Sequence, residues 1–321
     1  MAVYTHLTHE DIAELLTGYA VGELRLAIGI AEGVENSNYL LETSQGRYIL
    51  TVYEKRVQVE DLPFFLKLKE HLAARGIACP LPIARNDGAL VGTLTDHKPY
   101  ALISFLLGHA VSRPNPTQVG EVGQVLAQMH LAAADFDIAR ENALGPQGWQ
   151  KLYEHMHPEQ LEQIEAGLAT LIADELSYHA QYADETLPAG VIHADLFPNN
   201  VFFDGERLSG VIDFYFACND AYVYELGICL NCWCFELDGS FNATKARRLL
   251  QGYQTHRPLS EAEIEALPRM ARGAALRFLL TRAYDWIHTP ADAMVTRLDP
   301  LEYAHKLGFF QAVRSPGELG I

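Results

Sequence analysis

The sequence predicts an α+β protein with a small β-rich N-terminal lobe and a larger helical C-terminal lobe. Three observations predict this fold. The chain has 321 residues, more than a single compact core usually holds. Its first third is rich in β-type runs, and the remainder repeats apolar residues at helical spacing. We place the boundary after residue 107, which gives lobes over residues 1–107 and 108–321.

The first lobe is predicted to contain a five-stranded sheet with helices before and within it. Thr8, followed three residues later by Asp11, is a helix-capping pattern, and the apolar stripe after it predicts a helix over residues 8–19. Apolar residues at helical spacing predict another helix over residues 61–75. β-type runs predict strands at residues 22–30, 38–43, 47–53, 89–95 and 100–106.

The second lobe is predicted to be helical. Residues 108–116 contain Gly108, Pro114 and Pro116, which is typical of a connector. Ser260 and Glu263 form a capping box, and Pro268 is expected to bend or divide the helix that they open. The predicted helices cover residues 117–134, 158–180, 221–237, 243–254 and 260–287.

Composition excludes several classes of partner. About half of the residues are hydrophobic and a fifth are charged, as in ordinary globular proteins. The formal net charge of −17 argues against nucleic acids and anionic membranes, which bind clustered lysine and arginine. No apolar run approaches the ~20 residues of a membrane span, and the first residues lack a basic and apolar leader. We therefore expect a cytoplasmic protein that acts on a small molecule.

The cysteines fit that location. There are five, an odd number, which favours reduced thiols over a disulfide framework. Cys229, Cys232 and Cys234 are close enough together to suggest a metal site, but a second ligand pair is missing. A buried helix with small apolar cysteines is the better interpretation.

Two motifs together indicate the chemistry, which is phosphoryl transfer. Asp195 lies five residues before Asn200, as in the catalytic loop of a kinase, and Asp213 follows thirteen residues after Asn200. A transferred phosphoryl group needs positioning and a hard cation such as Mg²⁺, which prefers oxygen ligands. We expect Asp195 to orient or accept the proton of the attacking hydroxyl, and Asn200 and Asp213 to hold the metal.

A predicted hairpin explains how the two metal ligands could meet. Residues 201–203 and 208–212 form β-type runs, and Gly205 stands in the turn between them. Asn200 and Asp213 lie about equally far from that turn, so both fall at the open end of the hairpin. A short motif alone is weak, because such residues also cap turns, and the hairpin with its second Asp is what favours catalysis. His193 is expected to brace the loop rather than react.

The chain resembles a known superfamily at these motifs. The loop 193–200 and the segment 211–214 resemble those of the aminoglycoside phosphotransferase and choline kinase superfamily, which has a protein-kinase-like bilobal fold. Longer stretches resemble the bacterial homoserine kinases of this fold, at residues 48–56, 189–197, 212–220 and 279–286. This resemblance implies ATP, Mg²⁺ and transfer of phosphate to the side-chain hydroxyl of L-homoserine, a step toward threonine. The residues themselves support a hydroxyl acceptor, because Asp195 has no role as a base toward an anion.

The resemblance also implies where the nucleotide binds. Ser37 and Asn38 end the loop between the first two strands and could hold phosphate, although an ordinary hairpin loop would look the same. Ser104, Phe105 and Leu106 would pass the adenine and offer backbone hydrogen bonds and an apolar wall.

One expected residue is missing. Kinases of the wider fold carry a lysine on the third strand that reaches the nucleotide phosphates, but Thr51 occupies this place. Lys55 and Arg56 follow closely, and they either reach the phosphates or end the strand in solvent. The sequence does not decide between these two interpretations.

Substrate recognition is less clearly encoded. An amino acid carries an ammonium and a carboxylate, and Asp220 and Arg282 are the candidates to bind them. Asp220 could instead cap the helix after it, and Arg282 could pair with Glu225 or Asp285.

Other functions stay open at this point. Tyr215, Phe216, Trp233 and Trp286 could form an aromatic cage for choline, although such residues are more often core. An aminoglycoside or ethanolamine kinase of the same fold is a further alternative. A nucleotide-binding protein without catalysis is an alternative of another class, because the strand lysine is missing.

Overall fold

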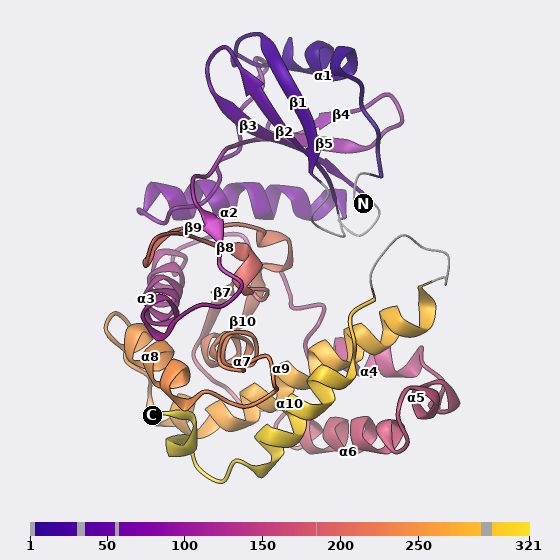
Figure 1. The fold of residues 1–321 in the computed structure, drawn as a ribbon, viewed down its shortest axis with the longest axis vertical. Helices are drawn as coiled ribbons and strands as arrows, with labels where there is room; N and C mark the ends of the chain where they lie inside the picture. Colours follow the sequence, from indigo (N-terminus) through magenta and orange to yellow (C-terminus); the bar gives the residue numbers. More distant parts are fainter. Residues whose placement is uncertain (1–3, 31–35, 55–57, 184, 290–296) are drawn as a thin grey trace. The chain divides into compact units, whose positions relative to one another are not determined.

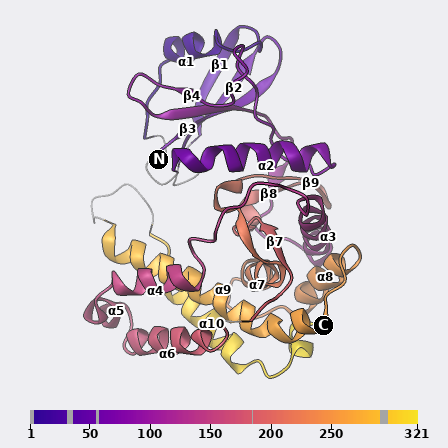
Figure 2. The ribbon, with the colours of Figure 1, turned by 180° about the vertical axis from the view of Figure 1, so that it is seen from behind.

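The computed structural model describes residues 4–30, 36–54, 58–183, 185–289 and 297–321. The chain divides into two compact units (Figures 1 and 2). The first contains Met1–Gly108 together with Ser209–Tyr215, and the second contains His109–Leu208 and Phe216–Ile321. The second unit is therefore not one continuous segment, because Ser209–Tyr215, which includes Asp213, groups with the first.

The first unit is built on an antiparallel sheet whose five strands were all predicted. The strand order is β1-β2-β3-β5-β4. The strand β4 is much shorter than predicted. Its Gly92 pairs with Tyr100 of β5, and a Cβ at position 92 would lie only 2.2 Å from Cζ of the tyrosine ring. The bounds are Leu24–Ile30 for β1, Asn36–Thr43 for β2, Arg47–Tyr53 for β3, Gly92–Thr93 for β4 and Pro99–Ser104 for β5.

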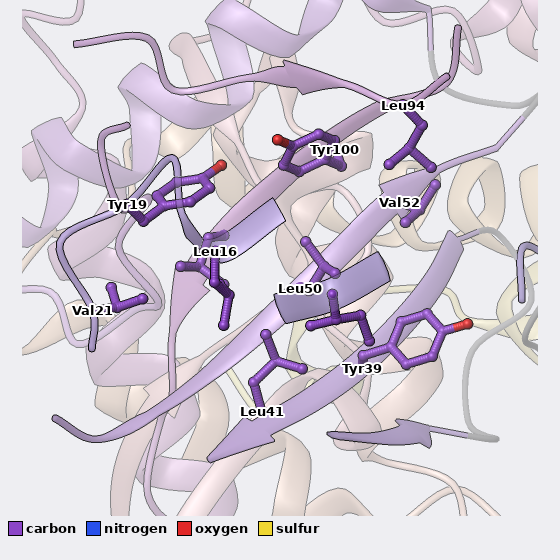
Figure 3. Close-up of a cluster of buried hydrophobic side chains, with 11 residues drawn as sticks. Leu16, Tyr19, Val21, Tyr39, Leu41, Leu50, Val52, Leu94 and Tyr100 are labelled. Atoms are coloured by element: carbon purple, nitrogen blue, oxygen red, sulfur yellow. The ribbon is translucent and has the colours of Figure 1, made fainter. Parts of the chain in front are cut away.

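One face of this sheet forms a hydrophobic core with the first helix (Figure 3). The helix α1, His9–Leu16, begins with the predicted capping box of Thr8 and Asp11 and contributes Ile12 and Leu16. In β2 the burial alternates, so that Tyr39 and Leu41 both point into the core. Period-two burial of this kind fixes the strand register, because a slip by one residue would expose the apolar set.

A second helix of this unit, α2, spans Leu62–Ala74 after a short 3₁₀ turn at Val59–Asp61. It matches the predicted helix over residues 61–75. Its buried side is apolar except for one residue, Lys69. A buried lysine on an apolar face is unusual enough to require a reason.

The second unit is mainly helical, and helices α3 and α8 pack together, as do α7 with α9 and α9 with α10 (Figure 1). Close approach of α3 and α8 depends on glycine: a Cβ on Gly123 would lie 2.1 Å from the Leu249 carbonyl oxygen. The helices are α3 Pro116–Ala132, α4 Pro146–Glu154, α5 Pro158–Ile164, α6 Leu168–Ala180, α7 Tyr222–Trp233, α8 Ala243–Gln254, α9 Glu261–His288 and α10 Leu301–Ala312. No helix of the described ranges is long and apolar enough to cross a membrane.

Several helical predictions need correction. The single helix predicted over residues 158–180 is two helices, α5 and α6, because Gly167 adopts φ +86° between them. Pro268 does not divide α9, which runs unbroken from its predicted capping box at Ser260 and Glu263. The helices α4 and α10 were not predicted.

Two small sheets flank the loop over residues 193–200, which contains Asp195 and Asn200. The strand β7, Ala189–Ile192, pairs antiparallel with β10, Cys218–Ala221. The predicted hairpin is present as β8, Val201–Asp204, and β9, Arg207–Val211, with Gly205 at φ +61° in the turn. A short strand β6, His109–Ala110, pairs with β8, so the segment predicted as a connector contributes to this sheet.

Candidate functional site

The loop after β7 brings Asp195 and Asn200 together. The Asn200 side-chain Nδ2 donates to the Asp195 carbonyl oxygen at 2.8 Å and to its carboxylate Oδ2 at 3.2 Å. A 3₁₀ turn at Pro198–Asn200 produces this return of the chain, and the Asn200 N–H closes it on the Phe197 carbonyl oxygen at 2.9 Å. Since the Asn200 amide nitrogen is directed at Asp195, its carbonyl oxygen Oδ1 is turned away from that residue. That oxygen is suited to bind a hard cation.

The residue before Asp195 has a strained backbone. Ala194 has φ +62°, a left-handed conformation that residues with a side chain rarely adopt. Two buried side chains form hydrogen bonds with its backbone N–H and carbonyl groups. Glu225 accepts a hydrogen bond from the Ala194 N–H at 2.7 Å, and the Arg277 guanidinium donates to the Ala194 carbonyl oxygen. Strain of this kind persists only where the surroundings over-determine it, and it is frequent at functional sites.

Glu225 is the main brace of this loop. It lies on α7 with no solvent exposure, and its Oε2 also accepts from the His193 N–H at 3.1 Å. His130 on α3 contacts the same Oε2 through Nε2 at 2.8 Å. Burial favours the neutral acid, but the hydrogen bonds from His130 and the Ala194 backbone outweigh it and lower the pKa of the Glu225 carboxyl. An ionised Glu225 therefore fixes the backbone of His193 and Ala194, the two residues before Asp195.

The electrostatic surroundings of Asp195 suit a proton acceptor. Burial raises the pKa of the Asp195 carboxyl, while the positive charge of Arg277 partly opposes this effect. A carboxylate whose pKa is raised towards the working pH accepts a proton more readily. His193 is placed as predicted for a brace, because its Nδ1 accepts a hydrogen bond from the Asp195 N–H at 3.3 Å.

Asp213 is the second strained position. It follows β9 in the first unit and has φ +65°, again in the left-handed region. Its segment is anchored by Tyr215, whose ring packs edge-on against Tyr53 of β3 and Phe65 of α2. The hydroxyl groups of Tyr215 and Tyr53 lie 3.2 Å apart. Asp213 is therefore held by the sheet and helix of the first unit.

The two residues predicted to hold phosphate already have partners inside the first unit. The Ser37 hydroxyl accepts from the backbone N–H groups of Tyr4 and Thr5 and donates to Glu54. Asn38 Oδ1 accepts from the Thr51 hydroxyl at 2.8 Å. The neighbouring residues 31–35 and the candidates Lys55 and Arg56 lie outside the described residues.

The predicted adenine segment follows β5. The Ser104 N–H donates to the Leu81 carbonyl oxygen at 2.8 Å, and the Phe105 N–H reaches the Arg47 carbonyl oxygen at 3.4 Å. The contacts of the described residues do not use the Leu106 N–H in this way. The Leu106 side chain packs against Gly210, where a Cβ would lie 2.5 Å from Cδ2 of the leucine.

The two substrate candidates differ in their surroundings. Asp220 lies on β10 and accepts from Asn142 Nδ2 and from the Ala221 N–H, both at 2.6 Å. Burial raises the pKa of the Asp220 carboxyl, and the hydrogen bond from Asn142 partly opposes this. Arg282 on α9 is paired with Glu302 of α10 at 2.6 Å, which is neither of the two partners considered from the sequence.

Trp233 and the cysteines have structural roles. Trp233 is buried, and its Nε1 donates to the Leu196 carbonyl oxygen at 2.6 Å, so it supports the loop rather than a cage. Cys229 and Cys234 are buried free thiols, and no group of three or more His, Cys, Asp or Glu in the described part of the chain could hold a metal. This favours the interpretation of the cysteines as core residues. Asn200 and Asp213 each carry a side-chain oxygen, the type of ligand that magnesium takes from proteins.

Comparison with known proteins identifies the family. The model of the phosphotransferase enzyme family matches residues 27–259. The chain belongs to the phosphotransferase enzyme family. It is 54% identical over 321 residues to a protein named homoserine kinase from Agrobacterium fabrum, with 100% of this chain and 99% of the relative covered. A homoserine kinase from Paramagnetospirillum magneticum is 54% identical, with full coverage of both chains.

Solved structures of other kinases have the same fold as this chain. An amicoumacin kinase in complex with AMP-PNP and Ca²⁺ has a TM-score of 0.74 at 14% identity, covering 98% of this chain and 93% of the other. A microcompartment-associated aminopropanol kinase has a TM-score of 0.65 at 20% identity, with 94% and 95% covered. The predicted kinase-like fold and the predicted class of enzyme are confirmed.

Three side chains that hold the phosphotransferase loop in place were not predicted from the sequence to be functional groups. His130, Glu225 and Arg277 are buried polar side chains on three different helices. A signal was present for Glu225, since it stands among apolar residues on α7. Burial of a charged side chain in such a stretch requires partners, but the sequence does not show that the partners are backbone groups of the loop.

Proposed function

We propose that this phosphotransferase is a homoserine kinase, which transfers phosphate from ATP to the side-chain hydroxyl of L-homoserine to form O-phosphohomoserine on the route to threonine. The observation that carries the proposal is the 53–56% identity to several curated homoserine kinases along their whole length. The geometry of the Asp195 loop supports it, because a carboxylate with a raised pKa suits an acceptor that gives up a proton.

Asp195 is proposed as the catalytic base. Its carboxylate has a raised pKa and is fixed in position by Asn200, while the strained Ala194 and its brace Glu225 determine the direction of the loop. A carboxylate in this state orients the substrate hydroxyl and takes its proton as the bond to phosphorus forms. Orientation of the reacting oxygen is a large part of such catalysis.

Asn200 and Asp213 are proposed as the ligands of Mg²⁺. Asn200 directly precedes β8 and Asp213 follows β9, and these strands are hydrogen-bonded neighbours in one hairpin. The Oδ1 of Asn200 and the carboxylate of Asp213 are oxygen ligands of the type that Mg²⁺ prefers. When bound, the cation would neutralise charge on the phosphate oxygens and align them.

The nucleotide is proposed to lie along the segment after β5. Leu106 offers a backbone N–H and an apolar side chain to adenine, whereas the N–H groups of Ser104 and Phe105 are engaged by Leu81 and Arg47. Their carbonyl groups and the Phe105 ring complete the wall. Ser37 and Asn38 stay candidates for the phosphates, and binding there would exchange their present hydrogen bonds.

For the substrate, Asp220 is the stronger of the two candidates. Its carboxylate accepts two hydrogen bonds, and β10 is paired with β7, the strand that enters the catalytic loop. A carboxylate in this position suits the substrate ammonium. Arg282 stays a prediction, since the structure pairs it with Glu302. We place the enzyme in the cytoplasm, in agreement with its five free thiols.

A coupled assay of ADP release tests the function. Homoserine, serine, threonine, choline and an aminoglycoside are compared at saturating ATP, with and without Mg²⁺. We expect homoserine to have the highest kcat/KM and the activity to require the cation. Faster turnover of choline or the aminoglycoside would overturn the assignment of the substrate, and ADP release from none of them would overturn the assignment as a kinase.

A matched pair of variants tests the role of Asp195. Asp195→Asn should reduce kcat by roughly 10²–10⁴-fold, the usual contribution of general base catalysis, without weakening the binding of AMP-PNP. Asp204→Asn removes an exposed carboxylate from the neighbouring hairpin and should change neither. Retention of kcat in Asp195→Asn would contradict the proposed base.

A further inference from the structure

Lys69 of α2 is a buried cation that the catalytic scheme does not use. Its side chain is 3% exposed and lies on the otherwise apolar side of the helix. Two other buried lysines in the chain are paired with carboxylates, Lys245 with Glu236 at 2.8 Å and Lys306 with Glu302 at 2.6 Å. The Lys69 ammonium instead lies over the Tyr215 ring, 5.3 Å from its centroid.

An arrangement of this kind is unfavourable for folding alone. Taking an ammonium out of water without a paired carboxylate destabilises a protein, and a ring face repays only part of the loss. Burial lowers the pKa of Lys69 to about 8, and the thiol of Cys79 and the carboxylate of Asp213 oppose this effect. A methionine would fill the same space without the charge. Residues that break such a local rule are concentrated at functional sites.

The surroundings of Lys69 connect it with the proposed metal and phosphate site. Tyr215, the ring beneath the ammonium, is two residues after Asp213, and Asp213 acts electrostatically on Lys69. The Tyr215 hydroxyl lies 3.2 Å from that of Tyr53, and Thr51 is a hydrogen-bonding neighbour of the same tyrosine. All five side chains belong to the first unit. Lys69 on the helix and Thr51 on the strand are therefore both neighbours of Tyr215.

Position 51 of the third strand does not supply that cation. Thr51 occupies the position at which kinases carry a phosphate-binding lysine, and its hydroxyl is engaged by Asn38. In those kinases the helix contributes a glutamate that pairs with the strand lysine. Here the helix contributes a buried lysine, and position 51 of the strand holds a neutral residue.

We propose that Lys69 supplies, from α2, the cation that the third strand lacks, and that its ammonium binds the nucleotide phosphates beside Asp213. The proposal rests on the assignment of Asp213 to the metal and phosphate site made above. In the wider fold, this helix carries the glutamate that pairs with the phosphate-binding lysine, whereas here the helix residue would itself bind phosphate.

Lys69→Met tests this role, with Lys67→Met as its matched control. Lys67 lies on the same helix but is exposed. Binding of AMP-PNP with Mg²⁺ is measured by calorimetry, and the melting temperature of each variant is measured without nucleotide. We expect Lys69→Met to bind AMP-PNP at least tenfold more weakly, about 1.4 kcal/mol, and to melt at the same temperature as the parent or higher. Lys67→Met should match the parent in both measurements.

Binding of AMP-PNP within twofold of the parent by a folded Lys69→Met would overturn the proposal, and so would an equal loss of affinity for adenosine, which has no phosphate. A much lower melting temperature with unchanged affinity would assign Lys69 to the core. Lys69→Gln, which is shorter, is measured in parallel, so that a folding defect of one variant does not decide the result.

Asp213→Asn separates this proposal from the one on which it rests. If Asp213→Asn abolishes the effect of Mg²⁺ on AMP-PNP binding while Lys69→Met binds normally, the inference about Lys69 is wrong and the metal site stands. If Asp213→Asn retains the full effect of Mg²⁺, the metal site itself is wrong, and the inference is wrong with it.

Discussion

Replacement of Glu225 by glutamine should weaken both the stability and the activity of the enzyme. Both carboxylate oxygens of Glu225 accept hydrogen bonds, Oε1 from the Ala194 N–H and Oε2 from the His193 N–H and His130. Glutamine keeps one acceptor and turns the other into a donor that faces a backbone N–H. His130 can adapt through its tautomer, but a backbone N–H cannot.

The size of the effect follows from these bonds. Glu225→Gln loses one hydrogen bond to a charged acceptor, about 1.5–3 kcal/mol, and leaves a buried N–H unsatisfied, about 1–3 kcal/mol. The free energy of unfolding should therefore fall by about 3–5 kcal/mol, which lowers the melting temperature by roughly 10 °C. Because Ala194 is held in its strained conformation by the same bonds, kcat should fall by about 10–100-fold.

Calorimetry and the ADP-release assay measure these two effects. Glu165→Gln is the control, because that carboxylate is exposed and its replacement should change the free energy of unfolding by less than about 0.5 kcal/mol. A fall in the melting temperature of less than about 2 °C for Glu225→Gln, together with an unchanged kcat, would refute the reasoning that this carboxylate fixes the loop.

Three further predictions concern other parts of the molecule. Burial opposes ionisation of Glu175, but hydrogen bonds from His179, Arg272 and Gln311 outweigh it and hold its pKa at about 2, below the ordinary 4.5. Its ionised form therefore stabilises the fold above pH 4.5, and this contribution is lost as the pH falls towards 2, so the melting temperatures of Glu175→Gln and the parent should converge over that range. In urea titrations, Gly123→Ala should destabilise by about 1–3 kcal/mol through its clash with α8, whereas Gly308→Ala, with open space around it, should stabilise by about 0.5–1 kcal/mol; equal effects would contradict the close packing of α3 and α8. Arg282→Met should change the KM for homoserine by less than about twofold, because Glu302 already binds the guanidinium; a rise of about tenfold would support the substrate role instead.

Local patterns in the sequence were sufficient for much of the fold. The capping boxes at Thr8 and Ser260 and the strand runs of the first lobe are determined by residues close in the chain, and the structure contains them. The hairpin that carries Asn200 and Asp213 at its ends was predicted from a turn and two short β runs in the same way.

What could not be predicted depends on contacts between distant residues. The strand β6 is two residues long and exists because β8 lies beside it, so the composition of its own segment indicates only a connector. Glu165 ends α5 in an extended conformation, and Gly167 precedes α6 with a positive φ, but an isolated glycine in a helical pattern does not reveal this break. At the site, Glu225 and Lys69 acquire their roles from backbone and ring partners far away in the sequence.

The division of the chain limits how it can be taken apart. The polypeptide passes between the two units after Gly108, after Leu208 and after Tyr215. A single proteolytic cut near residue 108 would therefore release neither unit, because two further covalent links remain. A fragment that ends at residue 108 would also lack Asp213 and Tyr215, so such a truncated protein should lose the Mg²⁺-dependent part of its nucleotide binding even if its sheet still formed.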